Sequence, residues 1–237
     1  MYSAFFLKGV VMKKFGAFTL AEVLITLAII GVVAALTMPS LISYYKKQEV
    51  ETKLKRFYTN INQAVKLSEV ENGPVEYWDI PQSSEVGTVE EAEECYNRYF
   101  AKYLKTISSG VEHGIVYNDD GSEVDYELDY FLVKFPDGSA MSFSLAGGLN
   151  ILFFTNASKV NSSRSAVDSF SFNLHKLKTV GSKNTVEPCT YLWDGTKENL
   201  ISHPRYGCSA QTAGKAFCAK LIQMNGWKIP EDYPVKF

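Results

Sequence analysis

The sequence predicts an α+β fold in which one long N-terminal helix packs on an antiparallel sheet. A long apolar stretch near the N-terminus continues into a helical pattern with apolar residues three and four apart. A second helical pattern follows, and after Gly110 the apolar period changes to two, which is the period of strands. Helices followed by a run of strands give the layout of α+β domains.

Composition excludes several classes of protein. The chain has 237 residues, of which 46% are hydrophobic and 21% are charged, close to the average of soluble domains. This excludes a disordered acidic chain, a collagen and a protein with many membrane spans. The net charge of -2 gives no global basic surplus that would indicate nucleic-acid binding.

The first element is an uncharged stretch from Val23 to Ile42, long enough as a helix of about 30 Å to cross a bilayer. A buried core helix would show a polar stripe, and a secretory signal peptide would be shorter with a cleavage site after it. Lys13 and Lys14 precede the stretch, so we expect a single span with a cytoplasmic N-terminus. Glu22, at its start, is either shallow enough to reach the headgroups or a functional acid with a partner.

The helical pattern continues beyond this stretch. Apolar residues from Val50 to Val65 recur at helical spacing between Lys and Glu residues, so this part is amphipathic. Asn72, Gly73 and Pro74 form a strong stop signal. One helix is therefore predicted from about Phe18 to about Asn72.

A second helix is predicted over Glu90–Ile107, with acids at its start and lysines in its C-terminal half. Period-two patterns then predict an antiparallel meander, and Pro136–Asp137–Gly138 is its clearest turn signal. The segment from Lys178 to Phe237 reads as irregular, with a short helix between Gly214 and Asn225. The predicted strands are His113–Asn118, Glu127–Phe135, Ser139–Leu145, Ile151–Thr155 and Ser169–Leu174.

The N-terminal residues match a known pattern over Lys13 to Ile42, KKFGAFTLAEVLITLAIIGVVAALTMPSLI. A short basic leader is followed by a small residue, then Phe18, Thr19, Leu20 and Glu22, and then a long apolar helix. This string resembles the processing and assembly segment of type IV pilins and type II secretion pseudopilins. The C-terminal GWKIPEDYP resembles the end of a group of bacterial pilin-like proteins, and pilins share the predicted layout.

The resemblance implies a division into three parts. Residues 1–17 are then a leader, residues 18–42 the transmembrane and assembly helix, and residues 43–237 the soluble globular domain. Prepilin peptidase would cut between Ala17 and Phe18 and N-methylate Phe18; a cut after Gly16 is the alternative. Translation could start at Met1 or at Met12.

The resemblance also implies how the subunit assembles. Glu22 would pair with the Phe18 amine of a neighbouring subunit, because an unpaired acid in an apolar bundle is strongly unfavourable. Thr19 belongs to the same segment, Gly31 adds flexibility, and Pro39 should kink or locally melt the helix. The implied partners are other pilin or pseudopilin subunits, prepilin peptidase, an inner-membrane assembly platform and, before assembly, the lipid bilayer. The globular domain would be periplasmic or extracellular.

Chemistry for catalysis is not evident in the sequence. Nucleotide-binding and hydrolase motifs are missing, and the histidines His113, His175 and His203 lack metal-ligand spacing, so we expect no cofactor and no metal site. Residues 118–125 are rich in oxygen ligands but lack EF-hand spacing, and a solvated hairpin tip is the simpler interpretation.

Translocation would place the four cysteines in an oxidising compartment if the host is a diderm bacterium. We expect at least one disulfide in the C-terminal region, with Cys208–Cys218 or Cys189–Cys208 as candidates. Cys95 either joins a disulfide or is a buried thiol.

The function expected from the whole sequence is that of a structural subunit, most simply a minor one, of a type IV pilus or a type II secretion pseudopilus. A membrane-anchored binding module at a filament tip, such as an adhesin or a DNA-uptake receptor, is the alternative. A membrane-tethered hydrolase is a third hypothesis without a visible nucleophile and base. Nucleic acid is expected as a partner only in DNA uptake.

Overall fold

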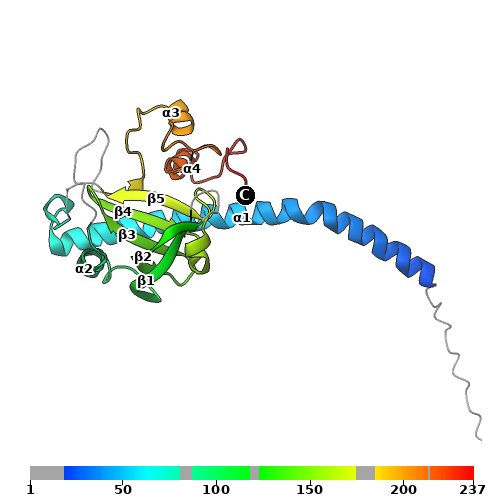
Figure 1. Cartoon of the computed structure of the whole chain (residues 1–237), viewed down its shortest axis with the longest axis horizontal. Coiled ribbons are helices and arrows are strands. Elements are labelled where there is room, and N and C mark those ends of the chain that lie inside the picture. Colours follow the sequence, from blue (N-terminus) through cyan, green and yellow to red (C-terminus); the bar gives the residue numbers. More distant parts are fainter. Residues whose placement is uncertain (1–18, 81–86, 118–122, 175–184, 213) are drawn as a thin grey trace, which may run out of the picture. The chain divides into compact units, whose positions relative to one another are not determined.

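The structure is a computed structural model that describes residues 19–80, 87–117, 123–174, 185–212 and 214–237. The chain divides into two compact units, Met1–Tyr44 and Tyr45–Phe237. Helix α1, Leu20–Asn72, contributes to both units (Figure 1). The predicted α+β class is confirmed, because this long helix is followed by an antiparallel sheet of six strands.

The C-terminal end of α1 is set by the signal read from the sequence. Gly73 follows Asn72 with a φ of 76°, a left-handed conformation that glycine adopts without a steric penalty. Pro74 comes next and cannot continue the helix because it lacks a backbone N–H. The predicted end at Asn72 is therefore confirmed.

The part of α1 in the second unit buries one face. The buried residues recur three and four apart, so they form one stripe that packs on the sheet. Phe57 lies at the centre of this stripe. The centroid of its ring is 4.3 Å from that of the Phe153 ring and 5.0 Å from that of the Phe172 ring. The apolar members of the stripe are Val50, Leu54, Phe57, Ile61, Ala64 and Val65.

Helix α2, Val89–Tyr99, is shorter than the predicted Glu90–Ile107. It begins with a capping box, in which the Thr88 hydroxyl accepts from Glu91 N at 3.2 Å and the Glu91 carboxylate accepts from Thr88 N at 2.7 Å. It ends because Phe100 leaves helical geometry and is fully buried in the core. Helical periodicity in the sequence alone could not show that the packing of Phe100 would end the helix at Tyr99.

The sheet is a meander in which each strand pairs antiparallel with its neighbour in the sequence. The predicted start of the first strand at His113 is wrong, because backbone pairing with the second strand extends to Ser108, opposite Lys134. The last strand was not predicted, since two residues are too short for a period to be visible. The strands are β1 (Ser108–Tyr117), β2 (Glu123–Lys134), β3 (Ala140–Leu145), β4 (Leu149–Phe154), β5 (Ser169–Leu174) and β6 (Glu187–Pro188).

The two faces of the sheet are covered differently. The main core lies between one face and helices α1 and α2, where the rings of Tyr96, Phe131 and Phe143 meet at 5.3–6.5 Å. On the other face a small cluster of Leu132, Ala140 and Phe154 is covered by the short 3-10 helix η2, Ala157–Ser162. Another 3-10 turn, η1 (Val75–Tyr77), follows the end of α1.

The C-terminal region carries two short helices, α3 (Lys197–Ser202) and α4 (Cys218–Met224), on the β5 side of the sheet in Figure 1. A disulfide joins Cys208 and Cys218, one of the two predicted candidates. Helix α3 was missed, although Thr196 caps it by accepting a hydrogen bond from Asn199 N at 3.1 Å.

Two of the cysteines that the sequence offered as disulfide candidates, Cys95 and Cys189, are not part of the disulfide. Cys95 is buried on α2, and Cys189 is buried just after β6. The candidate pair Cys189–Cys208 is therefore wrong for this structure. Burial raises the pKa of the Cys189 thiol, which makes it a poor nucleophile at neutral pH.

Candidate functional site

The N-terminal end of α1 is held by a capping box that the sequence analysis missed. The Glu22 carboxylate accepts hydrogen bonds from the backbone N–H and the hydroxyl of Thr19, both at 2.9 Å. In return, the Thr19 hydroxyl accepts from Glu22 N at 3.3 Å. The spacing Thr-x-x-Glu is the sequence signature of this cap, and it was visible at Thr19–Glu22. Glu22 therefore has a local structural role of its own.

The two carboxylate oxygens of Glu22 are used unequally. Both bonds from Thr19 reach Oε2. Among the described residues, no donor lies within hydrogen-bond distance of Oε1. One oxygen caps the helix, and the other can accept a further donor without breaking the cap.

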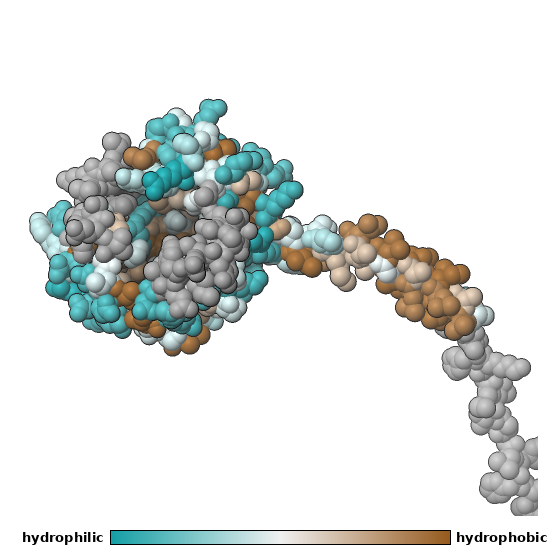
Figure 2. Space-filling model, viewed as in Figure 1, coloured by the Kyte–Doolittle hydropathy of each residue, from teal (hydrophilic) through white to brown (hydrophobic). Residues whose placement is uncertain are grey.

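From Val23 to Ile42, α1 carries no charged residue and its large apolar side chains are exposed; Figure 2 shows them on the face in view. Its most apolar window of 18 residues has a mean hydropathy of 2.4, so by length and composition this part of the helix could cross a membrane. The position of Gly31 is open, since an added Cβ would meet nothing within 4 Å. A helix that is hydrophobic all round needs lipid or other helices around it.

Pro39 lies inside α1, and helical geometry continues through it. The expectation of local melting there is wrong for this structure. Proline removes the donor for the carbonyl of Ala35, one turn earlier. The hydroxyl of Thr37 donates to Val33 O at 2.9 Å and that of Ser40 to Thr37 O at 2.8 Å, so nearby polar side chains serve the same turns.

In the second unit, α1 is joined to the end of the sheet by an ion-pair cluster around Asp168. Its side chain is only 7% exposed and accepts from Lys46 Nζ at 2.8 Å and from Arg164 Nε at 3.1 Å. Burial alone would raise the pKa of Asp168, but the hydrogen bond and charge of Lys46, together with Arg164, outweigh it and lower the pKa. Asp168 is therefore kept ionised by its cationic partners.

Two polar residues of α1 reach the strand β6 and its surroundings. The Asn62 side chain donates to Val186 O at 2.9 Å and accepts from Val186 N at 2.8 Å, which satisfies both backbone groups of one buried residue. The Tyr58 hydroxyl donates to Glu187 at 2.9 Å, and burial together with this carboxylate raises the pKa of Tyr58 to about 12.

A third residue of α1, Glu51, extends these contacts to the C-terminus, where it accepts from Lys228 Nζ at 2.6 Å and from Ile229 N at 2.9 Å. The polar contacts of α1 thus fix the C-terminal segment along the helix.

A group of rings lies near the disulfide. The Tyr191 and Tyr206 rings are 5.8 Å apart, and His203 stacks on Tyr206 at 5.2 Å. The neighbouring turn Thr190–Trp193 places Leu192 at a φ of 64°, although its side chain is 64% exposed. Only glycine adopts this conformation without a penalty, so an exposed leucine is held there under strain.

Several predicted site residues lie outside the described part of the chain: Gly16, Ala17, Phe18, His175 and residues 118–122. Of the other histidines, His113 lies on β1 with Nδ1 2.6 Å from Asp129 Oδ1, and both side chains are exposed. The ring of His203 accepts from the backbone N–H of Tyr206 at 3.1 Å. No group of three metal-ligating side chains occurs within the described ranges.

Comparison with known families agrees with this geometry. Residues 12–38 match the prokaryotic N-terminal methylation motif, which is the signature of type IV pilins and pseudopilins. Together with the long helix and the antiparallel sheet, this signature supports the class of pilin-like or pseudopilin subunits with a membrane anchor. Residues 40–237, most of the chain, match a family of unknown function (DUF6613), and the chain belongs to that family. No curated protein and no solved structure matches the chain.

Proposed function

We propose that this protein is a minor subunit of a type IV pilus or a type II secretion pseudopilus, processed before it is assembled. The observation that carries the proposal is the unequal use of the Glu22 oxygens. Oε2 caps α1 through Thr19, and Oε1 can accept a donor from another molecule while the cap stays in place. An N-terminal amine supplied by a neighbouring subunit fits this acceptor in both charge and size.

In the proposed mechanism, prepilin peptidase removes residues 1–17 and methylates the Phe18 amine, as the methylation motif at residues 12–38 supports. The globular domain from residue 43 onward then lies outside the cytoplasm, because Lys13 and Lys14 precede the apolar stretch. Assembly transfers the exposed apolar surface of α1 from lipid to the helices of neighbours. A charge pair at Glu22 fixes the register, since it is much stronger in an apolar surrounding than in water.

Two substitutions separate pairing from capping. Glu22→Gln keeps a side chain that can close the capping box but removes the charge. Glu22→Ala removes both. In the native host, we expect both variants to enter the membrane and both to be depleted from sheared filaments by about tenfold or more, which corresponds to about 1.4 kcal/mol per contact.

The readout is the ratio of filament to membrane protein on immunoblots. If Glu22→Gln assembles like the wild type while Glu22→Ala does not, Glu22 acts only as a helix cap. The control is Thr26→Val, because the Thr26 hydroxyl donates to Val23 O within the same helix and makes no contact with Glu22.

Processing is tested separately by mass spectrometry of the N-terminal peptide from the native host. We expect a peptide that begins with N-methylated Phe18. A filament or membrane fraction in which the peptide retains the residues from Met12 onward would contradict processing. A peptide beginning at Ala17 would move the cut to Gly16.

A binding module at the filament tip is a second candidate function. It is favoured by the strained and exposed turn at Leu192 beside the rings of Tyr191 and Tyr206. Strain at an exposed apolar residue is typical of sites selected for contact rather than for stability. Immunogold labelling distinguishes the two: label confined to filament ends supports the tip module, and label along the filament supports the structural subunit.

A further inference from the structure

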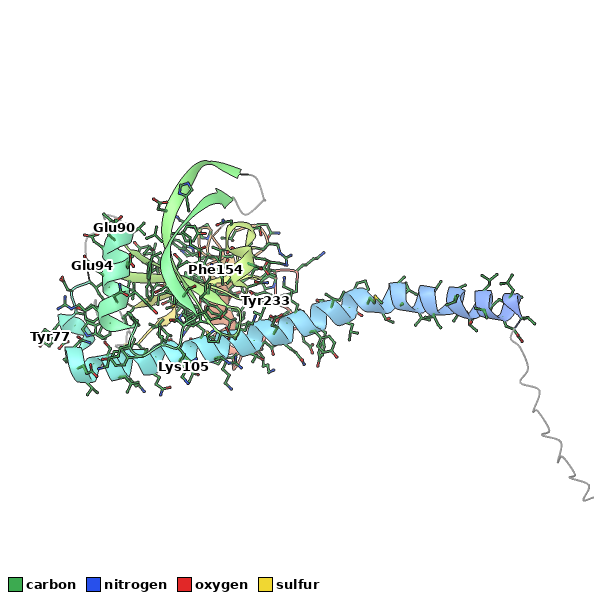
Figure 3. The ribbon with its side chains drawn as sticks, turned by 90° about the horizontal axis from the view of Figure 1, so that it is seen from below. Tyr77, Glu90, Glu94, Lys105, Phe154 and Tyr233 are labelled. Atoms are coloured by element: carbon green, nitrogen blue, oxygen red, sulfur yellow. A yellow bond between two sulfur atoms is a disulfide. The ribbon has the colours of Figure 1, made fainter. Side chains whose placement is uncertain are left out.

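A cavity of about 210 Å³ opens between α1 and the turn that joins β2 to β3. Its interior is apolar, with side chains from three separate elements: Phe57 and Ile61 on α1, Leu104 after α2, and Phe135 and Pro136 at the turn. The exposed side chains of Arg56, Asn60 and Lys105 lie at its mouth, and Lys105 is seen beside α1 in Figure 3. The polar lining residues are Arg56, Asn60, Lys105, Asp137 and Ser139.

The one carboxylate at the mouth is already neutralised. Asp137 Oδ1 accepts from Ser139 N at 3.1 Å and from the Ser139 hydroxyl, and Oδ2 lies 3.3 Å from Arg56 Nη1. The serine bonds and the nearby Lys53 and Arg56 charges outweigh the effect of burial and lower the pKa of Asp137, which therefore stays ionised. Its oxygens face these partners and leave the mouth without an unpaired negative charge.

The other polar side chains, those of Arg56, Asn60 and Lys105, all carry N–H donors. Within the described part of the chain, the side chains of Asn60 and Lys105 form no hydrogen bond or ion pair, and Arg56 uses a single nitrogen. Two cations, an amide and one paired carboxylate thus lie beside an apolar interior. A cavity of this kind, with a few polar groups at an apolar space, is the usual form of a small-molecule site.

We propose that this cavity binds a small carboxylate with a single negative charge and an apolar body, such as an aryl or short alkyl acid. The apolar body would lie against Phe57, Ile61 and Phe135. The carboxylate would meet the Arg56 guanidinium and the Lys105 ammonium, since charge-assisted hydrogen bonds to a carboxylate are the strongest available here. Because the cavity is smaller than the roughly 300–1,000 Å³ of most drug-sized sites, the ligand must be small.

Other occupants fit the observations less well. A neutral apolar molecule would leave both cations unused, and inorganic phosphate would leave the apolar interior empty. An acidic side chain of another subunit could reach the mouth but would fill little of the interior.

The test uses the full-length chain in detergent micelles, with phenylacetate as the probe and its neutral isostere phenylacetamide as the comparison. Ligand-observed NMR measures both. We expect phenylacetate to bind at least about fivefold more tightly than phenylacetamide, because only the acid meets the cations. No binding by phenylacetate, or equal binding by the two, would overturn the proposal.

Variants locate the site. Lys105→Gln should weaken phenylacetate binding by about fivefold and leave phenylacetamide unchanged. Lys55→Gln, on an exposed part of the same helix α1, is the matched control and should change neither. Asn60→Trp, at an exposed position on the rim, should block both ligands without disturbing the buried stripe. An unchanged affinity in Lys105→Gln and in Asn60→Trp would contradict the site.

A last arm separates the ligand from a neighbouring subunit. Carbodiimide crosslinking of filaments joins Lys105 to any carboxylate in contact with it. A crosslinked peptide between Lys105 and another subunit would overturn the proposal. With phenylacetate present, the carbodiimide activates the ligand's own carboxylate, so a phenylacetyl amide on Lys105 without such a peptide would support it. The NMR binding measurements use the unassembled chain, so their outcome does not depend on processing or assembly; only the crosslinking arm requires filaments.

Discussion

The two parts of α1 belong to one helix but differ in where their apolar side chains lie: they are exposed in the first part and buried along one stripe in the second. From Val23 to Ile42 the helix carries no charged residue and its large apolar side chains are exposed. The polar contacts there are local ones between Thr or Ser hydroxyls and the helix itself. From Val50 to Val65 one apolar stripe is buried, and residues such as Lys53 and Asn62 bind distant segments.

The difference determines whether each part of α1 can change the molecules that it contacts. A uniformly apolar surface has no preferred partner, so it can pass from lipid to neighbouring helices with little change in its contacts. The second part contacts the sheet and the C-terminal segment of its own chain, and it cannot leave them without unfolding the domain. The comparison predicts that stability depends on the second part and that assembly depends on the first.

The largest effect is expected from a matched pair of truncations on α1. Phe57→Ala removes a ring that packs on Phe153 and Phe172, and should lower the free energy of unfolding by about 3–5 kcal/mol. Leu27→Ala removes a side chain that is 60% exposed and should change it by less than about 0.5 kcal/mol. Denaturant titrations followed by tryptophan fluorescence measure both, because Trp78, Trp193 and Trp227 all lie in the second unit. If the two substitutions lowered the free energy of unfolding equally, the idea that only the second part of α1 stabilises the fold would be wrong.

Sequence reasoning predicted the buried stripe of α1 well, because its helical period is long and ends at a clear stop signal. It predicted the meander for a similar reason, since Asp137 and Gly138 mark the turn between two alternating runs. Phe100 shows the limit: it continues a helical pattern, yet it is turned inward by packing against Trp78 and Phe143. Such packing depends on residues distant in the sequence, which no local pattern reveals.

The site was predicted less evenly. Glu22 was singled out because an acid beside an apolar stretch is conspicuous, but its cap through Thr19 was overlooked. The cavity near Lys105 could not be predicted, because its walls come from three elements whose relative placement only the fold determines. Likewise, four cysteines could not by themselves indicate that Cys208 pairs with Cys218.

The next largest effect should come from the disulfide, which joins Cys208 to Cys218 at the start of α4 within the C-terminal region. Replacing Cys208 and Cys218 together by alanine should lower the free energy of unfolding by about 2–3 kcal/mol, as expected for a loop of this length. Thiol titration under denaturing conditions should find two thiols before reduction and four after it. Four thiols before reduction, in protein taken from the cell envelope, would contradict the disulfide.

A smaller effect is expected at Asp168, where the second part of α1 meets the sheet. Its pKa is lowered in the folded protein, so its contribution to stability is present above the pKa of an unfolded aspartate, about 3.9, and is lost as the pH falls through the lowered value. Asp168→Asn should cost about 1–2 kcal/mol at pH 7. The difference from the wild type should shrink toward pH 3. The exposed Asp232→Asn is the control, and a pH-independent difference would rule out this explanation.

The smallest effect concerns an exposed apolar residue of the second unit. Leu192→Gly should raise the free energy of unfolding by up to about 1 kcal/mol, because glycine relieves the positive φ and little buried surface is lost. Leu192→Ala keeps the β-carbon and should give no such gain. If the two variants unfold alike, the strain at this turn is not what limits stability there.

The strand order also determines when the protein can finish folding. Every strand pairs with its neighbour in the chain, so the sheet grows by closing short hairpins, which is entropically inexpensive. The bonds from Asn62 to Val186 and from Glu51 to Ile229 span 124 and 178 residues. They cannot form until Val186 and Ile229, respectively, have emerged. A nascent chain halted before residue 185 would therefore contain strands β1 to β5 but not β6. Asn62 and Glu51 on α1 would still lack the backbone groups of Val186 and Ile229 that they bind.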